Sequence, residues 1–404
     1  MKIGIIGGGA AGFFSAIAAK ENYPKAEVVI FEKSNALLSK VKISGGGRCN
    51  VTNGCSNIND LCDAYPRGGK SLKKAFYIFN TKHTKEWFES RGVPLVTQTD
   101  NCVFPASQNS QSIIDCFMDE VSRLHINIEV DSGVKSITKI EDKLELNFTS
   151  EEISPRIFDK VIVTTGGSPK RSGLDWLEAL GHDIEEPVPS LFSFYMPNEP
   201  IAKLRGIVIE NALISVQSTK IKASGPLLIT HWGFSGPAIL KLSSYGARIL
   251  SEMNYNFKIQ VNWVNEQNND NVTNELKDII VYYPNKILSN YRPFGLPERL
   301  WLFLLEKYDL SPQKKWDELG KKALNKLVHI LTNDEYTVDD KSTYKEEFVT
   351  CGGVSLQSID LKTMQSKTCK NIYFAGEVLN IDAITGGFNF QAAWTTGFIA
   401  GKLK

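Results

Sequence analysis

The chain has 404 residues, of which 42% are hydrophobic and 23% are charged, and its formal net charge is +1. These values are typical of folded globular proteins, so they exclude a chain that is disordered, collagen-like or coiled-coil throughout. The near-neutral charge also lacks the basic excess of nucleic-acid-binding proteins, so nucleic acid is not the expected partner.

The number of cysteines and the hydropathy of the chain indicate the cellular compartment of the protein. Seven cysteines, an odd number spread along the chain, favour a reducing compartment over a disulfide framework. Cys49, Cys55 and Cys62 are six and seven residues apart. Zinc sites normally use closer pairs, so no metal site is predicted. The N-terminus lacks the features of a signal peptide, and no segment has the roughly 18 consecutive apolar residues of a membrane span. We expect a cytoplasmic protein with no membrane partner.

The first 32 residues follow the order strand, glycine-rich turn, helix, strand. Residues 3–6 and 27–32 are short apolar runs that favour buried parallel strands, and residues 10–20 have a helical pattern. The turn between the first strand and the helix, G-G-G-A-A-G, fits the dinucleotide-binding pattern G-x-G-x-x-G. This unit predicts a Rossmann-like domain.

Each residue of this motif has a separate predicted role. Gly7 permits the tight turn, Gly9 lets the backbone approach a pyrophosphate, and Gly12 lets the helix pack closely on the strand. Glu32 lies 20 residues after Gly12, the spacing expected of an acid that binds a ribose hydroxyl. Because the acid is a glutamate, a 2′-phosphate is not expected here, and the adenosine of FAD or NAD fits the site.

A second glycine-rich segment, S-G-G-G-R-C-N-V-T-N, runs from Ser44 to Asn53 within an irregular stretch, residues 44–70. Its glycines let the backbone come close to a flat or phosphorylated ligand. Arg48 can neutralise a phosphate or a reduced flavin. A redox dithiol needs a close second cysteine, so Cys49 is interpreted as a buried structural residue.

Further helices and strands are predicted after the first 32 residues. Residues 1–190 are expected to form the first part of an FAD-binding domain, with helices over 71–91 and 110–124, strands near 126–148 and a buried strand at 160–164.

Beyond this domain the pattern changes twice. Residues 191–263, with alternating strands and one helix near 237–251, predict a β-rich substrate domain, expected to be a β-barrel. Residues 264–345 predict a helical insertion, and residues 346–371 return to the β-rich domain. Residues 372–404 complete the FAD-binding domain. The expected fold class is therefore α/β: a Rossmann-like FAD-binding domain from both chain ends, with an inserted β-barrel domain and a nested helical domain.

A third motif lies near the C-terminal end. A strand at 372–375 is followed by Gly376 and Glu377, and a glycine-rich turn then opens a helix near 390–402. The carboxylate can accept hydrogen bonds from ribitol hydroxyls, and the helix N-terminus can stabilise negative charge on a reduced flavin. NAD alone does not need such an element, so the motif favours FAD.

These runs together resemble those of bacterial flavoproteins described as NAD(FAD)-utilising dehydrogenases, a family with aminoacetone oxidase-like and bile-acid reductase-like members. Besides the first two motifs, the resemblance rests on V-F-P-A-S (103–107), V-I-V-T-T-G-G-S (161–168), T-H-W-G-F-S-G-P-A-I-L (230–240), V-T-C-G-G-V (349–354) and A-G-E-V-L-N-I-D-A-I-T-G-G-F-N-F-Q-A-A-W (375–394). It implies FAD and the two nested insertions.

The resemblance also implies which residues contact FAD. Carried over by position, they are Gly7, Gly9, Ala11, Gly12, Glu32, Lys33, Lys40, Gly46, Arg48, Asn50, Val134, Gly376, Glu377, Asn389 and Phe390. Leu38-Ser39-Lys40 stands where the family usually has Gly-Arg-Lys, so only Lys40 is carried over from that run. No catalytic residue is assigned.

We expect an FAD-dependent oxidoreductase that transfers a hydride between flavin N5 and a small organic substrate or NAD(P)H. The chain has one G-x-G-x-x-G unit, so NAD(P)H is expected only as a transient electron donor. Two alternatives are a flavin amine oxidase that uses oxygen and a flavin-dependent RNA-modifying protein. The second would use a basic helix face made of Lys73, Lys74, Lys82 and Lys85, although such a run is more often a solvated face. His231 is either an acid or base over the flavin or a hydrogen-bonded core histidine, and the core interpretation is preferred.

Overall fold

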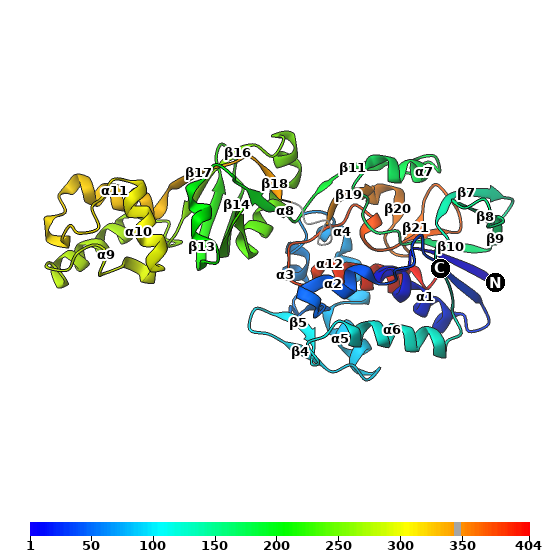
Figure 1. Cartoon of the computed structure of the whole chain (residues 1–404). Helices are drawn as coiled ribbons and strands as arrows, with labels where there is room; N and C mark the ends of the chain where they lie inside the picture. The colour runs from blue at the N-terminus through cyan, green and yellow to red at the C-terminus, as the bar shows by residue number, and fades with distance from the viewer. Residues whose placement is uncertain (343–348) are drawn as a thin grey trace. The chain divides into compact units, whose positions relative to one another are not determined.

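Strands from both ends of the chain form one seven-stranded sheet in the first of two compact units (Figure 1). The structure is a computed structural model that describes residues 1–342 and 349–404. The first unit comprises Met1–Ser190 and Tyr344–Lys404, and the second comprises Leu191–Thr343. In spatial order the strands are β20 (Ile359–Asp360), β21 (Gln365–Ser366), β22 (Ile372–Phe374), β10 (Lys160–Val163), β1 (Lys2–Ile6), β2 (Glu27–Phe31) and β6 (Asn127–Glu129).

The five strands from β22 to β6 run parallel, so their carboxyl ends lie along one edge of the sheet. Their near-continuous apolar sequences fit strands that are buried on both faces. Ile3, Ile5 and Val161, for example, have no exposed surface. The strands predicted at 3–6, 27–32 and 160–164 are confirmed to within one residue.

The first and last helices pack against each other through small residues. These helices are α1 (Ala10–Asn22) and α12 (Phe388–Ala400). A Cβ on Gly397 would lie 3.1 Å from the carbonyl oxygen of Ala11, and a Cβ on Gly401 would lie 2.6 Å from the Cβ of Ala18. Larger side chains at these two positions would force the helices apart. The N-terminal and C-terminal motifs therefore share one helix–helix interface.

The rest of the first unit holds short helices and small sheets. The helices are α2 (Ser39–Gly47), α3 (Ile58–Asp63), α4 (Gly69–Ile78), α5 (Thr81–Glu89), α6 (Gln111–Arg123) and α7 (Asp175–Glu178). The small sheets contain β3 (Thr52–Asn53), β4 (Leu95–Thr97) and β5 (Cys102–Pro105); β7 (Val134–Ile140), β8 (Lys143–Phe148) and β9 (Arg156–Phe158); and β11 (Ile184–Pro189) with β19 (Thr350–Val354).

The single helix predicted over 71–91 is wrong, because Asn80 divides this stretch into α4 and α5. The Asn80 side chain accepts hydrogen bonds from the backbone N–H groups of Lys82, at 3.0 Å, and His83, at 3.4 Å. An asparagine in this position starts a new helix. The predicted basic face is consequently spread over two helices, and its Lys82 is paired with Glu86 at 3.7 Å.

The second unit is built on another seven-stranded sheet, which is antiparallel throughout. In spatial order its strands are β17 (Asp334–Val338), β16 (Phe257–Asn262), β13 (Val208–Val216), β14 (Lys222–Thr230), β15 (Gly233–Ser235), β12 (Ser193–Tyr195) and β18 (Asp340–Ser342). The helices are α8 (Pro237–Glu252), α9 (Asn269–Tyr282), α10 (Glu298–Lys307) and α11 (Lys321–Thr332).

The expected closed barrel is not found. The outer strands β17 and β18 are separated in the chain only by Asp339, so the sheet must curve until its two edges approach each other there. Among the described residues, however, no strand pairing joins β17 to β18. The sheet is therefore curved but open at this edge.

The helices α9, α10 and α11 follow β16 and precede β17 in the chain. They share one continuous apolar core with the sheet, which includes the buried Trp263, Trp301 and Trp316. The predicted five-segment division into domains stays a prediction, and its boundary between residues 345 and 346 lies outside the described residues. In the described part of the chain no helix has the length and apolar character needed to cross a membrane.

Candidate functional site

The first glycine-rich turn joins β1 to α1 at the carboxyl edge of the parallel sheet. Gly7 has a φ of +114°, a conformation that glycine adopts without strain. The Thr164 hydroxyl holds this turn by donating to the carbonyl oxygens of Ile6 at 2.9 Å and Gly7 at 3.0 Å. A Cβ on Gly12 would lie 1.9 Å from the Gly7 carbonyl oxygen, so only glycine lets α1 approach so closely.

Gly9 differs from its two motif partners because its surroundings are open. It precedes the first residue of α1, and a Cβ placed there would meet no atom within 4 Å. The helix N-terminus carries unpaired N–H groups and a partial positive charge, which favour a phosphate. The predicted close packing at Gly12 agrees with the local geometry, and the approach of a pyrophosphate at Gly9 stays a prediction.

Glu32 follows β2 at the same edge and faces the glycine-rich turn. One carboxylate oxygen accepts a hydrogen bond from the Gly8 backbone N–H at 2.8 Å. The other accepts from the backbone N–H of Ser34 at 3.1 Å and from its hydroxyl at 2.9 Å. A carboxylate has about four acceptor positions, so this half-buried group retains capacity for a hydroxyl donor.

Lys33 and Val134, whose contacts with FAD stay predictions, flank a contact between two segments of the chain. The Ser132 backbone N–H donates to the Glu32 carbonyl oxygen at 2.8 Å. A Cβ on Gly133 would lie 3.1 Å from the Cβ of Lys33. The structure therefore brings the segment before β7 against the end of β2.

The C-terminal motif arrives at the same edge from β22. Gly376 has a φ of +78°, and a Cβ there would lie 2.7 Å from the Cβ of Ala11. Its backbone N–H donates to the Thr396 hydroxyl of α12 at 2.9 Å. The predicted residues Gly7, Gly9, Ala11, Gly12 and Gly376 are thus brought together from the two chain ends.

Glu377 forms an ion pair that the sequence did not predict. Its carboxylate accepts from Lys40 Nζ at 2.6 Å and from the Thr350 backbone N–H at 2.9 Å. The Lys40 side chain is 50% exposed and the Glu377 side chain is 19% exposed. Both residues were predicted separately, and no sequence signal links positions so far apart.

The second glycine-rich segment lies beside the start of α12. Asn53 Nδ2 donates to the Gly386 carbonyl oxygen at 2.9 Å, and a Cβ on Gly387 would lie 2.8 Å from Asn50 Oδ1. A Cβ on Gly46 would meet nothing within 4 Å. The segment therefore combines close contacts to the turn before α12 with open backbone positions at Gly46 and Gly47.

Arg48 is held along this segment by its own neighbours. Its Nε donates to the Gly45 carbonyl oxygen at 3.1 Å, and its Nη1 donates to Gln108 at 3.3 Å. The guanidinium lies 4.1 Å from the centre of the Phe104 ring. These contacts fix the direction of the side chain, and its predicted contact with FAD stays a prediction.

Asn389 and Phe390 lie in the first turn of α12 and make contacts within the first unit. The Asn389 side chain exchanges two hydrogen bonds with the backbone of Ala383, at 3.0 and 3.1 Å. The Phe390 ring stacks on Trp394, with centroids 5.5 Å apart. Trp394 is fully buried in the core of the first unit.

Sequence reasoning missed Gln391, a fully buried polar residue in the same helix. Its Oε1 accepts from the Thr52 hydroxyl at 2.6 Å and the Thr84 hydroxyl at 2.8 Å, and its Nε2 donates to Thr395 at 3.0 Å. It ties α12 to β3 and α5. An amide inside the apolar run F-N-F-Q-A-A-W was the available signal.

Arg67 was also missed, although its partner Asp382 belongs to a quoted motif. Arg67 Nε donates to the buried Asp382 carboxylate at 2.6 Å, and Arg67 Nη2 and the Ser190 hydroxyl complete the cluster. Burial opposes the charge of Arg67, but the hydrogen bond and charge attraction of Asp382 outweigh it and raise the pKa of Arg67. Arg67 lies in a stretch that the sequence left irregular.

The structure shows the surroundings of Cys49 and His231, the two residues considered above as possible reactive groups. Cys49 is buried, and loss of solvation raises the pKa of its thiol to about 12, which keeps it protonated at neutral pH. His231 lies exposed in the turn between β14 and β15, so its interpretation as a core histidine is wrong. The turn places it at the surface of the second unit because Thr230 and Gly233 close the hairpin through a 2.9 Å hydrogen bond.

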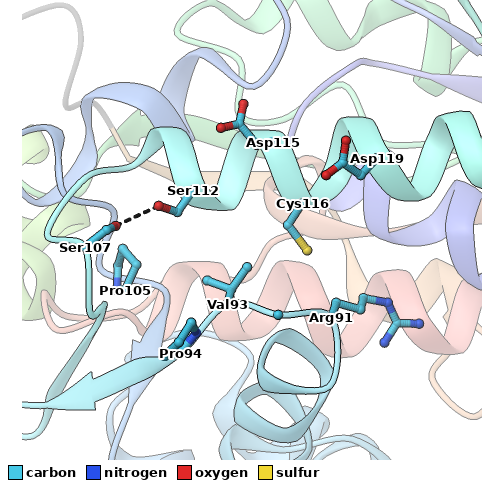
Figure 2. A pocket seen from close by; sticks show the side chains of 10 residues that line it. Arg91, Val93, Pro94, Pro105, Ser107, Ser112, Asp115, Cys116 and Asp119 are labelled. Atoms are coloured by element: carbon cyan, nitrogen blue, oxygen red, sulfur yellow. Dashed lines mark hydrogen bonds between the residues drawn. The ribbon is translucent and has the colours of Figure 1, made fainter.

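A cavity of about 250 Å³ lies in the first unit between α6 and the segment around Val93 (Figure 2). Asp115, Cys116 and Asp119 of α6 line it, and Cys116 points toward Val93 and Arg91 on the opposite side. Burial raises the pKa of Cys116 to about 12, so this thiol is not a nucleophile at neutral pH. The lining includes none of the predicted FAD-contacting residues, and we assign it no role.

Comparison with known proteins identifies relatives over the whole chain. The family described as the HI0933-like protein Rossmann domain matches residues 1–403. A 3-dehydro-bile acid Δ(4,6)-reductase from Clostridium scindens is 26% identical, with 99% of this chain and 98% of that protein aligned. A ribosomal RNA dihydrouridine synthase from Escherichia coli is also 26% identical, with 98% and 95% aligned. The resemblance drawn from the motifs is thereby confirmed.

Solved structures show the same fold at low identity. A 3-ketosteroid Δ4-(5α)-dehydrogenase from Rhodococcus jostii RHA1 matches with a TM-score of 0.52 and 11% identity, covering all of this chain and 96% of that one. A 3-ketosteroid Δ1-dehydrogenase from Sterolibacterium denitrificans matches with a TM-score of 0.52 and 10% identity, covering 99% and 98%. These matches support the Rossmann-type fold.

Proposed function

The chain belongs to the HI0933-like Rossmann-domain family, and on that premise we propose that it is an FAD-dependent oxidoreductase. One observation carries the proposal. Gly9 at the start of α1, Glu32 after β2 and the Gly376–Glu377 segment after β22 meet along one edge of the parallel sheet. Ligands of open α/β sheets bind at this edge.

The local geometry at the candidate residues is compatible with bound FAD. The open backbone at Gly9 and at Gly46 leaves room where a Cβ would otherwise fill the space. The start of α1 would hold the pyrophosphate, and Glu32, Lys33 and Val134 would hold the adenosine. Glu377 and the segment around Gly46 would hold the ribitol and flavin portions. When bound, FAD supplies hydride transfer at flavin N5.

We propose further that the substrate carries a carbon–carbon double bond conjugated to a carbonyl group. The names of the two relatives support this class, because a Δ(4,6)-reductase of a 3-dehydro-bile acid and a synthase of dihydrouridine both saturate such a bond. One carbon of the bond receives a hydride and the other receives a proton. NAD(P)H is the proposed transient source of the reducing equivalents.

An anaerobic assay tests this function. The reduced flavin is mixed separately with a neutral cyclic enone and with a uridine-containing RNA, and in a third sample the oxidised flavin is mixed with a primary amine. Re-oxidation by the enone or the RNA, with a product that has gained two hydrogens, is expected. Bleaching of the oxidised flavin by the amine, followed by recovery in oxygen, would instead establish the amine oxidase alternative.

A second candidate is the reduction of uridine in RNA. It is favoured by the dihydrouridine synthases of Escherichia coli and Haemophilus influenzae, each 26% identical and aligned over 98% of this chain. The overall charge of +1 speaks against an extensive nucleic-acid surface. A locally basic site would reconcile the similarity to RNA-modifying enzymes with the near-neutral overall charge.

A further inference from the structure

A basic cavity lies in the second unit, on surface that the FAD-binding residues do not use. It measures about 700 Å³ and is lined by Ala202, Lys203, Arg205, His231 and Arg299. The four basic residues are all exposed. Among the described residues, no carboxylate lines this cavity.

Three separate elements bring these side chains together. Lys203 belongs to a short 3-10 helix, Pro200–Leu204, and Arg205 follows it directly. His231 comes from the β14–β15 turn, and Arg299 comes from the first turn of α10. Arg299 Nη2 donates to the Lys203 carbonyl oxygen at 3.2 Å. The Gly206 backbone N–H donates to the Ile229 carbonyl oxygen at 2.8 Å. The cavity wall is therefore fixed by contacts within this unit.

In the described part of the chain, no acidic side chain balances the positive charges of the cavity. Within residues 1–342 and 349–404, none of Lys203, Arg205, His231 and Arg299 forms an ion pair. Three permanent positive charges around one cavity repel each other, and an anion between them relieves this repulsion. A carboxylate is satisfied by one arginine, whereas the several oxygens of a phosphate can accept from two arginines and a lysine at once.

We propose that this cavity binds a phosphate group of the substrate or of a nucleotide co-substrate. The inference deepens the proposed function and rests on it for the identity of the substrate. RNA and a phosphorylated nucleotide such as NADPH share this chemistry.

The test compares two double variants that each remove two positive charges. K203A/R205A acts in the cavity. K220A/K222A is the matched control, because these exposed lysines lie at the opposite end of the β13–β14 hairpin. Arg299 is left in place because it holds the Lys203 backbone. The full-length protein is titrated with a labelled uridine-rich RNA strand, with NADPH, with NADH and with inorganic pyrophosphate, at two salt concentrations.

We expect K203A/R205A to bind RNA about tenfold more weakly and the salt slope of binding to fall by about 1.4, while the control stays within about twofold. If RNA does not bind but NADPH or pyrophosphate binding falls in K203A/R205A alone, the site is supported with a nucleotide as its source. Equal losses in both double variants, no loss in either, or no binding of any phosphate ligand by the wild type would overturn the proposal.

Two further readouts keep this inference separate from the proposed function. Flavin content and reduction of the neutral enone by chemically pre-reduced flavin, without NAD(P)H, are measured in the same three proteins, and neither is expected to change by more than about twofold. If the wild type lacks flavin or enone reduction while the selective loss of phosphate binding persists, the proposed function fails and the phosphate site stands.

Discussion

Lys40 and Glu377 lie 337 positions apart in the chain, and their side chains meet at 2.6 Å. The contact joins α2, from the start of the first unit, to the segment after β22. Because the pair is partly exposed, solvent screens much of its attraction. Its main effect is to position Glu377, which also accepts the Thr350 backbone N–H.

Replacement of this pair should therefore affect FAD more than stability. We expect Lys40→Met to lower the free energy of unfolding of the apoprotein by less than about 1 kcal/mol. The dissociation constant for FAD, measured by fluorescence quenching, should rise severalfold. Lys82→Met, in the exposed pair with Glu86, is the control and should leave FAD binding unchanged. An unchanged FAD affinity in Lys40→Met would remove Lys40 from the site.

Two substitutions in the first motif distinguish packing from cofactor contact. Gly12→Val should lose flavin and fold poorly, because a side chain there meets the Gly7 carbonyl oxygen. Gly9→Ala should keep its apoprotein melting temperature, because nothing lies within 4 Å, and should still lose FAD. Gly320→Ala, at another open position, is the control. Purified wild-type protein should be yellow and release FAD rather than FMN. Full FAD occupancy in Gly9→Ala would contradict the proposed site.

A buried carboxylate stabilises the second unit. Asp334 has no exposed surface and accepts hydrogen bonds from Trp263 at 3.0 Å, Lys307 at 2.6 Å, Tyr308 at 2.8 Å and Tyr336 at 2.5 Å. Asp334→Ala leaves a lysine and three neutral donors without their acceptor, and we expect a loss of about 3 kcal/mol or more. Tyr308→Phe should cost about 1 kcal/mol. Denaturant unfolding measures both, and equal losses would show that the carboxylate is not the centre of the cluster.

His182 should make stability depend on pH. It is buried, and its two ring nitrogens lie 2.9 Å from the Leu177 carbonyl oxygen and 2.7 Å from the Ser366 hydroxyl. Burial lowers the pKa of His182 below its usual 6.5. The unfolded chain then binds a proton that the folded chain does not, so stability is full above pH 6.5 and falls as the pH decreases below it. Melting temperatures from pH 8 to 5 should show this decline, and His182→Gln should flatten it.

The kinetics should be ping-pong when NAD(P)H and an enone are varied together. The chain has one G-x-G-x-x-G unit, so no second nucleotide domain holds NAD(P)H while the substrate reacts. Both reactants then use the same flavin face in turn, which gives parallel double-reciprocal lines. Intersecting lines, or a crystal with both ligands in separate sites, would refute a shared cavity.

The elements that the sequence predicted best are those with strong local signals. The strands around Ile5 and Val161 are continuous apolar runs, and the turn at Gly7 has its glycines at fixed spacing, so both follow from local chemistry. The contacts of Glu377 with Lys40 and of Arg67 with Asp382 join distant segments, and no spacing rule predicts them. Asn80 shows the opposite error, because its capping signal was present within the chain and was read as helix interior.

The open barrel edge also depends on more than local pattern. Alternation along the strands gives the sheet, but closure depends on whether β17 and β18 come within hydrogen-bonding reach after Asp339. The exposure of His231 could not be predicted from local pattern either. The residues around it are compatible both with a turn that exposes the side chain and with a strand that buries it.

The interface between α1 and α12 has a consequence for how the protein is made. Residues 372–400, which supply β22 and α12, are translated after the whole of Leu191–Thr343. During translation, α1 is therefore made before the C-terminal segment that packs on Ala11 and Ala18. The sheet likewise lacks β22 beside β10 until that segment is synthesised. The second unit, whose strands and core come from one continuous stretch, can complete its fold during that interval. We therefore expect FAD to bind late in biosynthesis, because the proposed site is complete only after Gly376 and α12 have been synthesised.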